Sequence, residues 1–226
     1  MPKLLEDELV RMEVVLPTGT TLYRARPGFV GHGRGVGKPY EGADIGAPPP
    51  EKARAARANR EGEVVLYAAD QEATAIAEVR PWRGLYVSVA DPRATHDLRL
   101  VDLSKPPRPS NPFTAEAPQY EQEIEELLAA FGEELGRPVR RADDARDYLP
   151  CQKLVRRIRA SGFYDGIRYP SAMVEGGTNV VLFDPAVADI GPSKLVEVTQ
   201  VGVAYGPPRD DERRRPGARP HPRQSP

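Results

Sequence analysis

Three side chains of complementary chemistry flank one expected strand-to-helix junction: Arg57, Tyr67 and Glu78. A guanidinium group binds phosphate oxygens, an aromatic ring stacks on a flat ligand, and a carboxylate stabilises a developing positive charge. Each residue alone has a plainer interpretation, Arg57 as solvated surface, Tyr67 as a core aromatic and Glu78 as an exposed helix charge. Their combination around one junction favours a site for an anionic ligand.

The local sequence predicts the elements that position these side chains. The short apolar run 64–69 is rich in β-branched residues and ends at Asp70, which is typical of a buried strand. Asp70 is then predicted to cap a helix over 71–79, because its side chain can accept from the free N–H groups of the first turn. Ala75 and Glu78 share a face of this helix. We therefore expect the carboxylate to stand beside small side chains that leave room for a ligand.

The sequence around this junction resembles the RES-domain family. Its members have a motif like GR-x-N-x-x-G, then a strand ending in LY, then TA-x-x-E on a helix. The matching residues here are Arg57, Asn59, Gly62, Leu66, Tyr67, Thr74, Ala75 and Glu78. Ala56 stands where the family usually has glycine, and this departure affects backbone freedom but not chemistry.

Later blocks of the chain continue the resemblance. Residues 147–152 are similar to the family segment Y-x-x-T/C-Q, and residues 162–172 are similar to the block G-x-DG-I-x-Y-x-S. Residues 177–184 match the closing N-x-x-LF strand, and residues 21–24 are similar to the opening strand, whose arginine faces the pocket. Together the matches run over 16–205.

Members of this family act as toxins of bacterial toxin-antitoxin pairs and resemble ADP-ribosyltransferases in fold. They destroy NAD by hydrolysing or phosphorolysing the nicotinamide-ribose bond. The resemblance therefore implies an α+β fold with central mixed and antiparallel sheets flanked by helices. It implies NAD as a substrate, no bound cofactor, inorganic phosphate as an optional co-substrate, and a cognate Xre-like antitoxin as the protein partner.

The resemblance also implies catalytic roles for Glu78, Arg57, Tyr67 and Ser171. Nicotinamide leaves without needing a proton, so the transition state is a ribosyl cation of oxocarbenium type, and Glu78 is the candidate for stabilising it or binding ribose hydroxyls. Tyr67 would stack on the nicotinamide ring or orient it through its hydroxyl. Ser171 would donate to the carboxamide or to a phosphate, although a serine after Pro170 often simply closes a turn.

Arg24, Arg57, Tyr67 and Asn179 are the candidate substrate-binding residues on the same resemblance. Arg24 and Arg57 are expected at the phosphates, because a guanidinium fork matches phosphate oxygens and keeps its charge at any working pH. Asn179 lies in the segment that matches the closing strand. These assignments are interchangeable on the sequence alone.

Length and composition predict one folded domain with polar ends. Of the 226 residues, we assign 1–14 to an N-terminal lead, 15–205 to the domain, and 206–226 to a Pro/Arg-rich tail that is expected to be disordered. A formal net charge of -1 argues against nucleic-acid binding by this chain itself. Neither a membrane-spanning run nor a signal peptide is apparent, so a cytoplasmic protein is expected.

The cysteine and histidine residues argue against two other kinds of site. Cys151 is the only cysteine, so an internal disulfide is excluded, and a packing role is favoured because no histidine lies near it in sequence to activate a thiolate. His32, His96 and His221 lack Cys or His partners at ligand spacing. The sequence therefore predicts no metal site.

Strands and helices alternate along the rest of the domain. The predicted strands are 20–26, 64–69, 85–90, 98–103, 167–171, 179–183 and 195–205. Amphipathic helices are predicted over 119–135 and 144–160, and their apolar stripes are expected to pack in the core. The Gly- and Pro-containing stretch 27–56 is expected to be a mobile or partly helical loop.

Two further functions share this set of residues. A mono-ADP-ribosyltransferase would transfer the same ribosyl cation to a protein side chain, and it differs from the NAD-destroying enzyme only in the acceptor. A non-catalytic NAD-binding module would keep the pocket without the reaction. Retention of a full set of candidate catalytic residues argues against the module.

Overall fold

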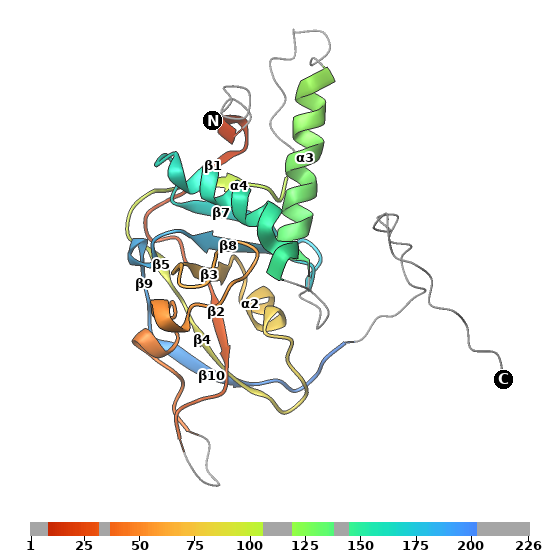
Figure 1. Cartoon of the computed structure of the whole chain (residues 1–226). Coiled ribbons are helices and arrows are strands. Elements are labelled where there is room, and N and C mark those ends of the chain that lie inside the picture. The colour runs from red at the N-terminus through yellow and green to blue at the C-terminus, as the bar shows by residue number, and fades with distance from the viewer. Residues whose placement is uncertain (1–8, 32–36, 106–118, 138–144, 203–226) are drawn as a thin grey trace, which may run out of the picture.

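The computed structural model describes residues 9–31, 37–105, 119–137 and 145–202. One five-stranded sheet has the order β1 (Glu13–Leu16), β6 (Leu98–Asp102), β7 (Gly166–Pro170), β8 (Thr178–Leu182) and β3 (Leu66–Ala69). Strands β6 and β7 run parallel, and the other neighbouring pairs are antiparallel (Figure 1). The fold is α+β with a mixed central sheet, as predicted.

A second, three-stranded antiparallel sheet has the order β10 (Ser193–Glu197), β4 (Tyr86–Ala90) and β2 (Arg24–Pro27). A short pair, β5 (Arg93–Ala94) and β9 (Ala188–Asp189), lies beside the two sheets. Tyr23 and Ala69 exchange two backbone hydrogen bonds of 2.8 Å, which join the segment entering β2 to the end of β3. Strand β3, which carries Tyr67, is therefore fastened to both sheets.

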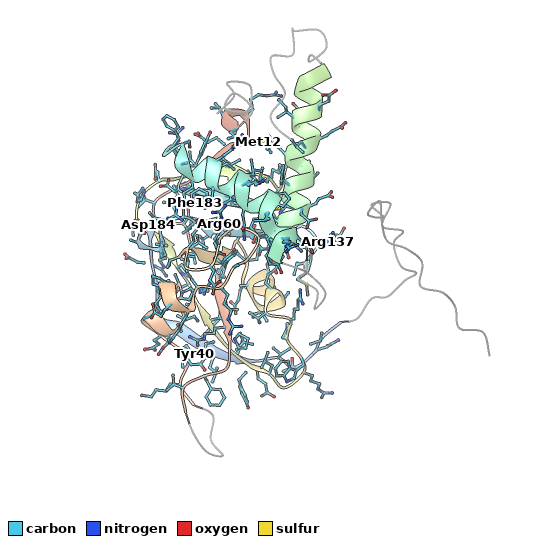
Figure 2. The ribbon with its side chains drawn as sticks, in the orientation of Figure 1. Met12, Tyr40, Arg60, Arg137, Phe183 and Asp184 are labelled. Carbon is cyan, nitrogen blue, oxygen red and sulfur yellow. The ribbon has the colours of Figure 1, made fainter. Side chains whose placement is uncertain are left out.

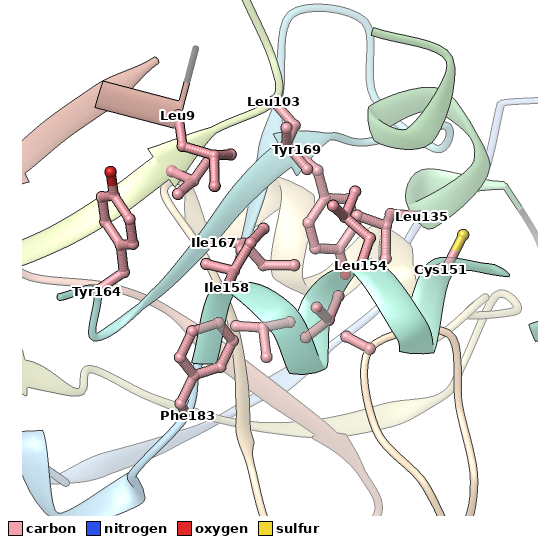
Figure 3. Packing of buried hydrophobic residues seen from close by; sticks show 14 of the residues in the cluster. Leu9, Leu103, Leu135, Cys151, Leu154, Ile158, Tyr164, Ile167, Tyr169 and Phe183 are labelled. Atoms are coloured by element: carbon pink, nitrogen blue, oxygen red, sulfur yellow. The ribbon is translucent and has the colours of Figure 1, made fainter. Parts of the chain in front are cut away.

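Helices α3 (Gln119–Gly136) and α4 (Leu149–Ala160) cover one face of the five-stranded sheet (Figure 1). Figure 3 shows Ile158 of α4 against Ile167 of β7, and both side chains are fully buried. Leu135 of α3 belongs to the same cluster. Because burying one large aliphatic side chain stabilises a fold by about 1.5–3 kcal/mol, this cluster holds the helices to the sheet.

The opposite face of the five-stranded sheet and the second sheet have their own clusters. Leu66, Leu100 and Leu182 are fully buried on that opposite face. The short helix α2 (Glu72–Glu78) packs instead on the three-stranded sheet, where Ile76 contacts the cluster that contains Val87. Helix α2 thus follows β3 directly and leaves its last residue near both sheets.

Several strand and helix boundaries differ from the prediction. Strand β2 begins only at Arg24, and Thr21 and Tyr23 before it form single bridges. The predicted strand 195–205 is wrong beyond Glu197, where β10 ends. Val198 still exchanges two backbone hydrogen bonds with residues 84 and 85, which continue the pairing beside β4 by one residue. Residues 203–205 lie outside the described residues.

The predicted helix 144–160 divides into two parts. A 3-10 turn, η3 (Ala145–Tyr148), precedes α4, and residue 144 lies outside the described residues. Pro150 occupies the first turn of α4, where its missing N–H leaves no hydrogen bond unmade. The proline therefore favours a new helix start at Leu149, and periodicity alone did not reveal it.

The folded part of the chain extends further toward the N-terminus than predicted. Strand β1 begins at Glu13, and Leu9 and Met12 are buried in the core cluster with α4, so the predicted boundary at residue 15 falls inside a strand. The strand was missed because it is four residues long and its burial does not alternate clearly. The predicted disordered tail 206–226 lies outside the described residues.

The stretch 27–56 is partly helical, as predicted. It contains two 3-10 turns, η1 (Gly42–Asp44) and η2 (Pro50–Lys52), and residues 32–36 within it are not described. Ser88 of β4 donates to the carbonyl of Gly28 at 2.7 Å and accepts from the N–H of Tyr40, labelled in Figure 2, at 2.9 Å. These bonds fasten the described part of the loop to the second sheet.

None of the helices in the described ranges combines the length and the apolar character needed to cross a membrane.

Candidate active site

Three of the predicted site residues meet through direct hydrogen bonds. Glu78, the last residue of α2, accepts on one oxygen, Oε1, from Ser171 Oγ and from Asn179 Nδ2, each at 2.7 Å. Bonds to an ionised carboxylate are stronger than neutral ones, so they fix the orientation of this side chain. No donor in the described part of the chain reaches Oε2 of Glu78, which leaves that oxygen for a ligand.

Ser171 reaches Glu78 from a tight turn between β7 and β8. Its N–H donates to the carbonyl of Gly177 at 2.9 Å, and its Oγ accepts from two backbone N–H groups that follow in the turn. A Cβ atom added at Gly177 would lie 2.5 Å from Oγ1 of Thr74 on α2. The turn therefore packs against α2 only because residue 177 has no side chain. Ser171 both closes a turn, as its plainer interpretation holds, and binds the carboxylate.

Two adjoining cavities surround this carboxylate. Their volumes are about 400 Å³ and about 150 Å³, and Tyr67, Glu78, Tyr169 and Asn179 line both. The larger cavity falls within the range of roughly 300–1,000 Å³ that is typical of small-molecule sites. Glu78 thus stands where the two cavities meet, in a position to contact a ligand that extends from one cavity into the other.

Tyr169 is a site residue that sequence reasoning did not single out. It is buried, and it pairs across the β7–β8 ladder with Asn179. Asn179 also pairs with Ala69 of β3, two residues beyond Tyr67, so Tyr67, Tyr169 and Asn179 lie on the same face of the sheet. The sequence indicated Tyr169 only through its place in the block 162–172. That its side chain lies on the same sheet face as Tyr67 became evident only from the strand register.

The Tyr67 hydroxyl is occupied within the protein. It donates to Asn59 Oδ1 at 2.8 Å, and Asn59 Nδ2 donates in turn to three backbone carbonyls of residues 54, 60 and 63. Burial raises the pKa of the Tyr67 hydroxyl, so it stays protonated as a donor. The ring rather than the hydroxyl is therefore the part of Tyr67 that is available to a ligand, which favours stacking.

We predict that Tyr67→Phe destabilises the protein but retains most of the NAD-cleaving activity that the family resemblance implies. The substitution leaves the buried Asn59 Oδ1 without a donor, a loss of about 1–3 kcal/mol in the free energy of unfolding, while the ring remains. Denaturant unfolding and the rate of nicotinamide release from NAD measure the two effects. Tyr86→Phe is the control, since that hydroxyl makes no hydrogen bond to the described residues. Unchanged stability with lost activity would show that the Tyr67 hydroxyl contacts the substrate.

Arg24 lies at the wall of the smaller cavity and already has backbone partners. Its Nε donates to the carbonyl of Ile45 at 2.5 Å and its Nη1 to the carbonyl of Tyr67 at 2.6 Å. Burial, followed by the neighbouring Arg26, lowers the pKa of Arg24 to about 10, so the side chain remains charged at neutral pH. Arg24 therefore joins the 27–56 loop to β3 besides lining the cavity.

Arg57 lines the larger cavity and is bound to the end of α3. Its Nη1 pairs with Glu134 Oε1 at 2.5 Å, its Nε donates to the carbonyl of Arg137 at 3.2 Å, and its guanidinium lies over the Tyr148 ring at 5.1 Å. Arg137 lies at the end of α3 in Figure 2. Arg57 does not bond to Glu78, so the two predicted residues line one cavity without a direct hydrogen bond between them.

Gln152 is a second residue whose role was missed. Its side chain is buried, and Nε2 donates to the carbonyls of Ala56 at 2.8 Å and Asn59 at 2.9 Å. It therefore holds the loop that carries Arg57 against α4. The only sequence signal was its place at the end of the block 147–152.

The prediction that Asp70 caps α2 is wrong. Gln71 occupies the N-cap position and makes no side-chain cap bond. Asp70 instead accepts from the N–H of Thr178 at 3.1 Å and from Nη2 of Arg168 at 3.0 Å, which joins the end of β3 to β8 and β7. Tertiary partners outweighed the local capping bond, because a charge-assisted bond to arginine is the stronger interaction.

A third cavity of the described chain lies away from these two. It is about 950 Å³, and it is bounded by α3 and α4, with Leu127 and Lys153 among its lining residues. None of the predicted site residues lines it. A carboxylate, two amphipathic rings and several cations converge instead at the two cavities beside Glu78, which makes them the candidate active site.

Neither a metal site nor a reactive cysteine is found among the described residues. Within the described ranges, no group of three or more His, Cys, Asp or Glu side chains is arranged to hold a metal ion. Cys151 is fully buried in the core cluster, and burial, followed by Glu134, raises the pKa of its thiol to about 11. The thiol is therefore protonated at neutral pH, and the predicted packing role is confirmed.

The comparison with known families agrees with the motifs. A family model described as the RES domain matches residues 21–200, a span that contains every predicted site residue. No curated protein and no solved structure matches the chain. Since the match covers most of the sequence, the chain belongs to the RES-domain family.

Proposed function

We propose that this protein is a toxin-like enzyme that cleaves NAD at the bond between nicotinamide and ribose. The carrying observation is the Glu78 carboxylate, which Ser171 and Asn179 hold at the junction of two cavities. Membership of the RES-domain family, a toxin-like and NAD-related enzyme family, supports NAD as the substrate. NAD is consumed in this proposal and does not act as a cofactor.

The proposed reaction depends mainly on a fixed negative charge and does not require a proton donor for the leaving group. When the bond between C1′ and the pyridinium nitrogen breaks, the bonding electron pair leaves with nicotinamide and positive charge spreads over C1′ and the ring oxygen. An ionised Glu78 stabilises that charge, and the bonds to its Oε1 keep it preorganised. The rings of Tyr67 and Tyr169 would stack on the nicotinamide, since both line the two cavities.

The acceptor at C1′ decides which enzyme this is. Water gives ADP-ribose and a proton, and the protein is then a glycohydrolase. Inorganic phosphate gives ADP-ribose phosphate, and the protein is then a phosphorylase. A protein side chain as acceptor would make it a mono-ADP-ribosyltransferase, which shares the same cleavage step.

Incubation of the purified chain with NAD, with and without inorganic phosphate, tests this proposal. We expect free nicotinamide together with either ADP-ribose or ADP-ribose phosphate, separated by chromatography. Release that depends on phosphate identifies the phosphorylase, and release without phosphate identifies the glycohydrolase. If folded protein releases no nicotinamide, NAD depletion is wrong, and transfer of label from NAD to cell-extract proteins then distinguishes a transferase from a binding module.

We also propose a cognate Xre-like antitoxin as the partner that covers these cavities. This part rests on family membership. Adding the purified antitoxin to the NAD reaction is expected to stop nicotinamide release in proportion to the complex formed. A partner that forms a stable complex and leaves the rate unchanged would contradict coverage of the cavities.

A further inference from the structure

Arg80 lies two residues beyond Glu78 and lines the larger cavity together with Arg57 and Arg137. Arg57 and Arg137 both bind Glu134, at 2.5 Å and 3.4 Å. Arg80 is exposed, and no carboxylate of the described residues lies within ion-pair distance of it. Of the three arginines, Arg80 is therefore the one whose charge is not balanced by Glu134.

The charges around this cavity favour an anion. Its lining residues include three arginines and one carboxylate, Glu78, which stands at the junction with the smaller cavity. Glu134, outside the lining, pairs with two of the arginines, so the positive charge that remains unbalanced is that of Arg80. A ligand with its cationic, reacting end at Glu78 and two negative charges further along the larger cavity would match this arrangement. The diphosphate of a dinucleotide has that charge and that position relative to the ribose.

The backbone of Arg80 is unusual for its residue type. Its φ is 50°, in the left-handed region, and within the described ranges it is the one residue other than glycine with a positive φ. Glycine is the common residue at this position after a helix, because it adopts the conformation without strain. Pro81 restricts the conformation of Arg80 further. Strained backbone of this kind clusters at functional sites, which makes Arg80 a candidate for a role in this cavity.

We propose that Arg80 forms a subsite for the diphosphate of the nucleotide substrate. The guanidinium fork donates two parallel hydrogen bonds to phosphate oxygens, and Arg57, paired with Glu134, lines the same cavity. The subsite rests on the proposed function for the identity of the whole substrate. Its ligand class, an organic diphosphate, follows from the cavity itself.

Binding to the full chain tests the subsite without any reaction. The probes are ADP-ribose and inorganic pyrophosphate, which carry a diphosphate, and nicotinamide, which carries none, each titrated by calorimetry. Arg80→Gln is expected to weaken both diphosphate probes by about 10–100-fold and to leave nicotinamide binding unchanged. Arg80→Lys is expected to retain part of the affinity. Arg83→Gln, an exposed arginine three residues on that lines neither cavity, is expected to change nothing.

Arg80→Gly separates the subsite from a structural role. Glycine relieves the left-handed strain, so the melting temperature is expected to stay the same or to rise while diphosphate affinity is lost. A melting temperature that falls together with unchanged ADP-ribose affinity would overturn the subsite. So would wild-type affinity for ADP-ribose in Arg80→Gln, or no measurable binding of either diphosphate probe to the wild-type chain.

The outcomes for the subsite and for NAD cleavage are independent. If ADP-ribose binding depends on Arg80 but no nicotinamide is released from NAD, the subsite is supported and NAD cleavage is wrong. If the protein releases nicotinamide and Arg80→Gln leaves the KM for NAD unchanged, NAD cleavage is supported and the subsite is wrong. If both hold, Arg80→Gln raises the KM for NAD more than it lowers kcat.

Discussion

Glu78→Gln is expected to lower the rate of nicotinamide release from NAD by about 10²–10³-fold and to leave the fold intact. Glutamine has nearly the same shape as glutamate, and its side-chain oxygen can still accept from Ser171 and Asn179. What the substitution removes is the negative charge beside the developing ribosyl cation. The loss should therefore appear in kcat, because the charge is needed in the transition state more than in the ground state.

Glu72→Gln is the matched control for this prediction. Glu72 lies on the same helix, forms an exposed ion pair of 2.7 Å with Lys194 and lines neither cavity at the site. We expect the rate to stay within about twofold of the wild-type value, because an exposed ion pair contributes little to stability. Equal losses in both variants would mean that general damage to α2, and not the charge at residue 78, explains the effect.

The local part of the site could be predicted from the sequence because strand, turn and helix follow one another directly. Tyr67 and Glu78 belong to one strand-to-helix unit, and the 3.6-residue period places Glu78 beside Ala75. Ser171 and Asn179 were placed only through the family resemblance. Their meeting with Glu78 depends on the β3–β8 and β7–β8 registers, and periodicity does not determine which strands pair.

The contacts of the arginines could not be predicted. The pairing of Arg57 with Glu134 joins residues far apart in sequence, and nothing in the local pattern of either residue indicates the other. The sequence does not distinguish Arg80 from other surface arginines, because an exposed arginine after a helix is common. Its left-handed backbone is a consequence of the fold. For Asp70 a local prediction failed. The residue type is well suited to cap a helix, but its carboxylate binds Arg168 and Thr178 on neighbouring strands instead.

Gln152→Met is expected to lower the stability of the domain clearly, because it removes two buried hydrogen bonds at once. Methionine has a similar length and fills the same buried space, but it cannot donate to the carbonyls of residues 56 and 59. The two carbonyls keep one backbone donor each, at 3.4 Å for Ala56 and 3.0 Å for Asn59, so each lost side-chain hydrogen bond costs about 0.5–1.5 kcal/mol. For a domain of this size, each kcal/mol lowers the melting temperature by about 2–4 °C, which thermal unfolding measures directly.

The same substitution should also impair the site from a distance. Gln152 fastens the loop that carries Asn59, which orients the Tyr67 hydroxyl, and Arg57, which lines the larger cavity. Loosening this loop therefore disturbs Tyr67 and Arg57, to which Gln152 makes no hydrogen bond. We expect a raised KM for NAD at temperatures well below the melting transition. Lys153→Met, the same replacement at the exposed neighbour on α4, should change neither quantity. A Gln152→Met protein that melts earlier but keeps the wild-type KM would show that the loop keeps its position without this anchor, and that α4 supports the fold and not the site.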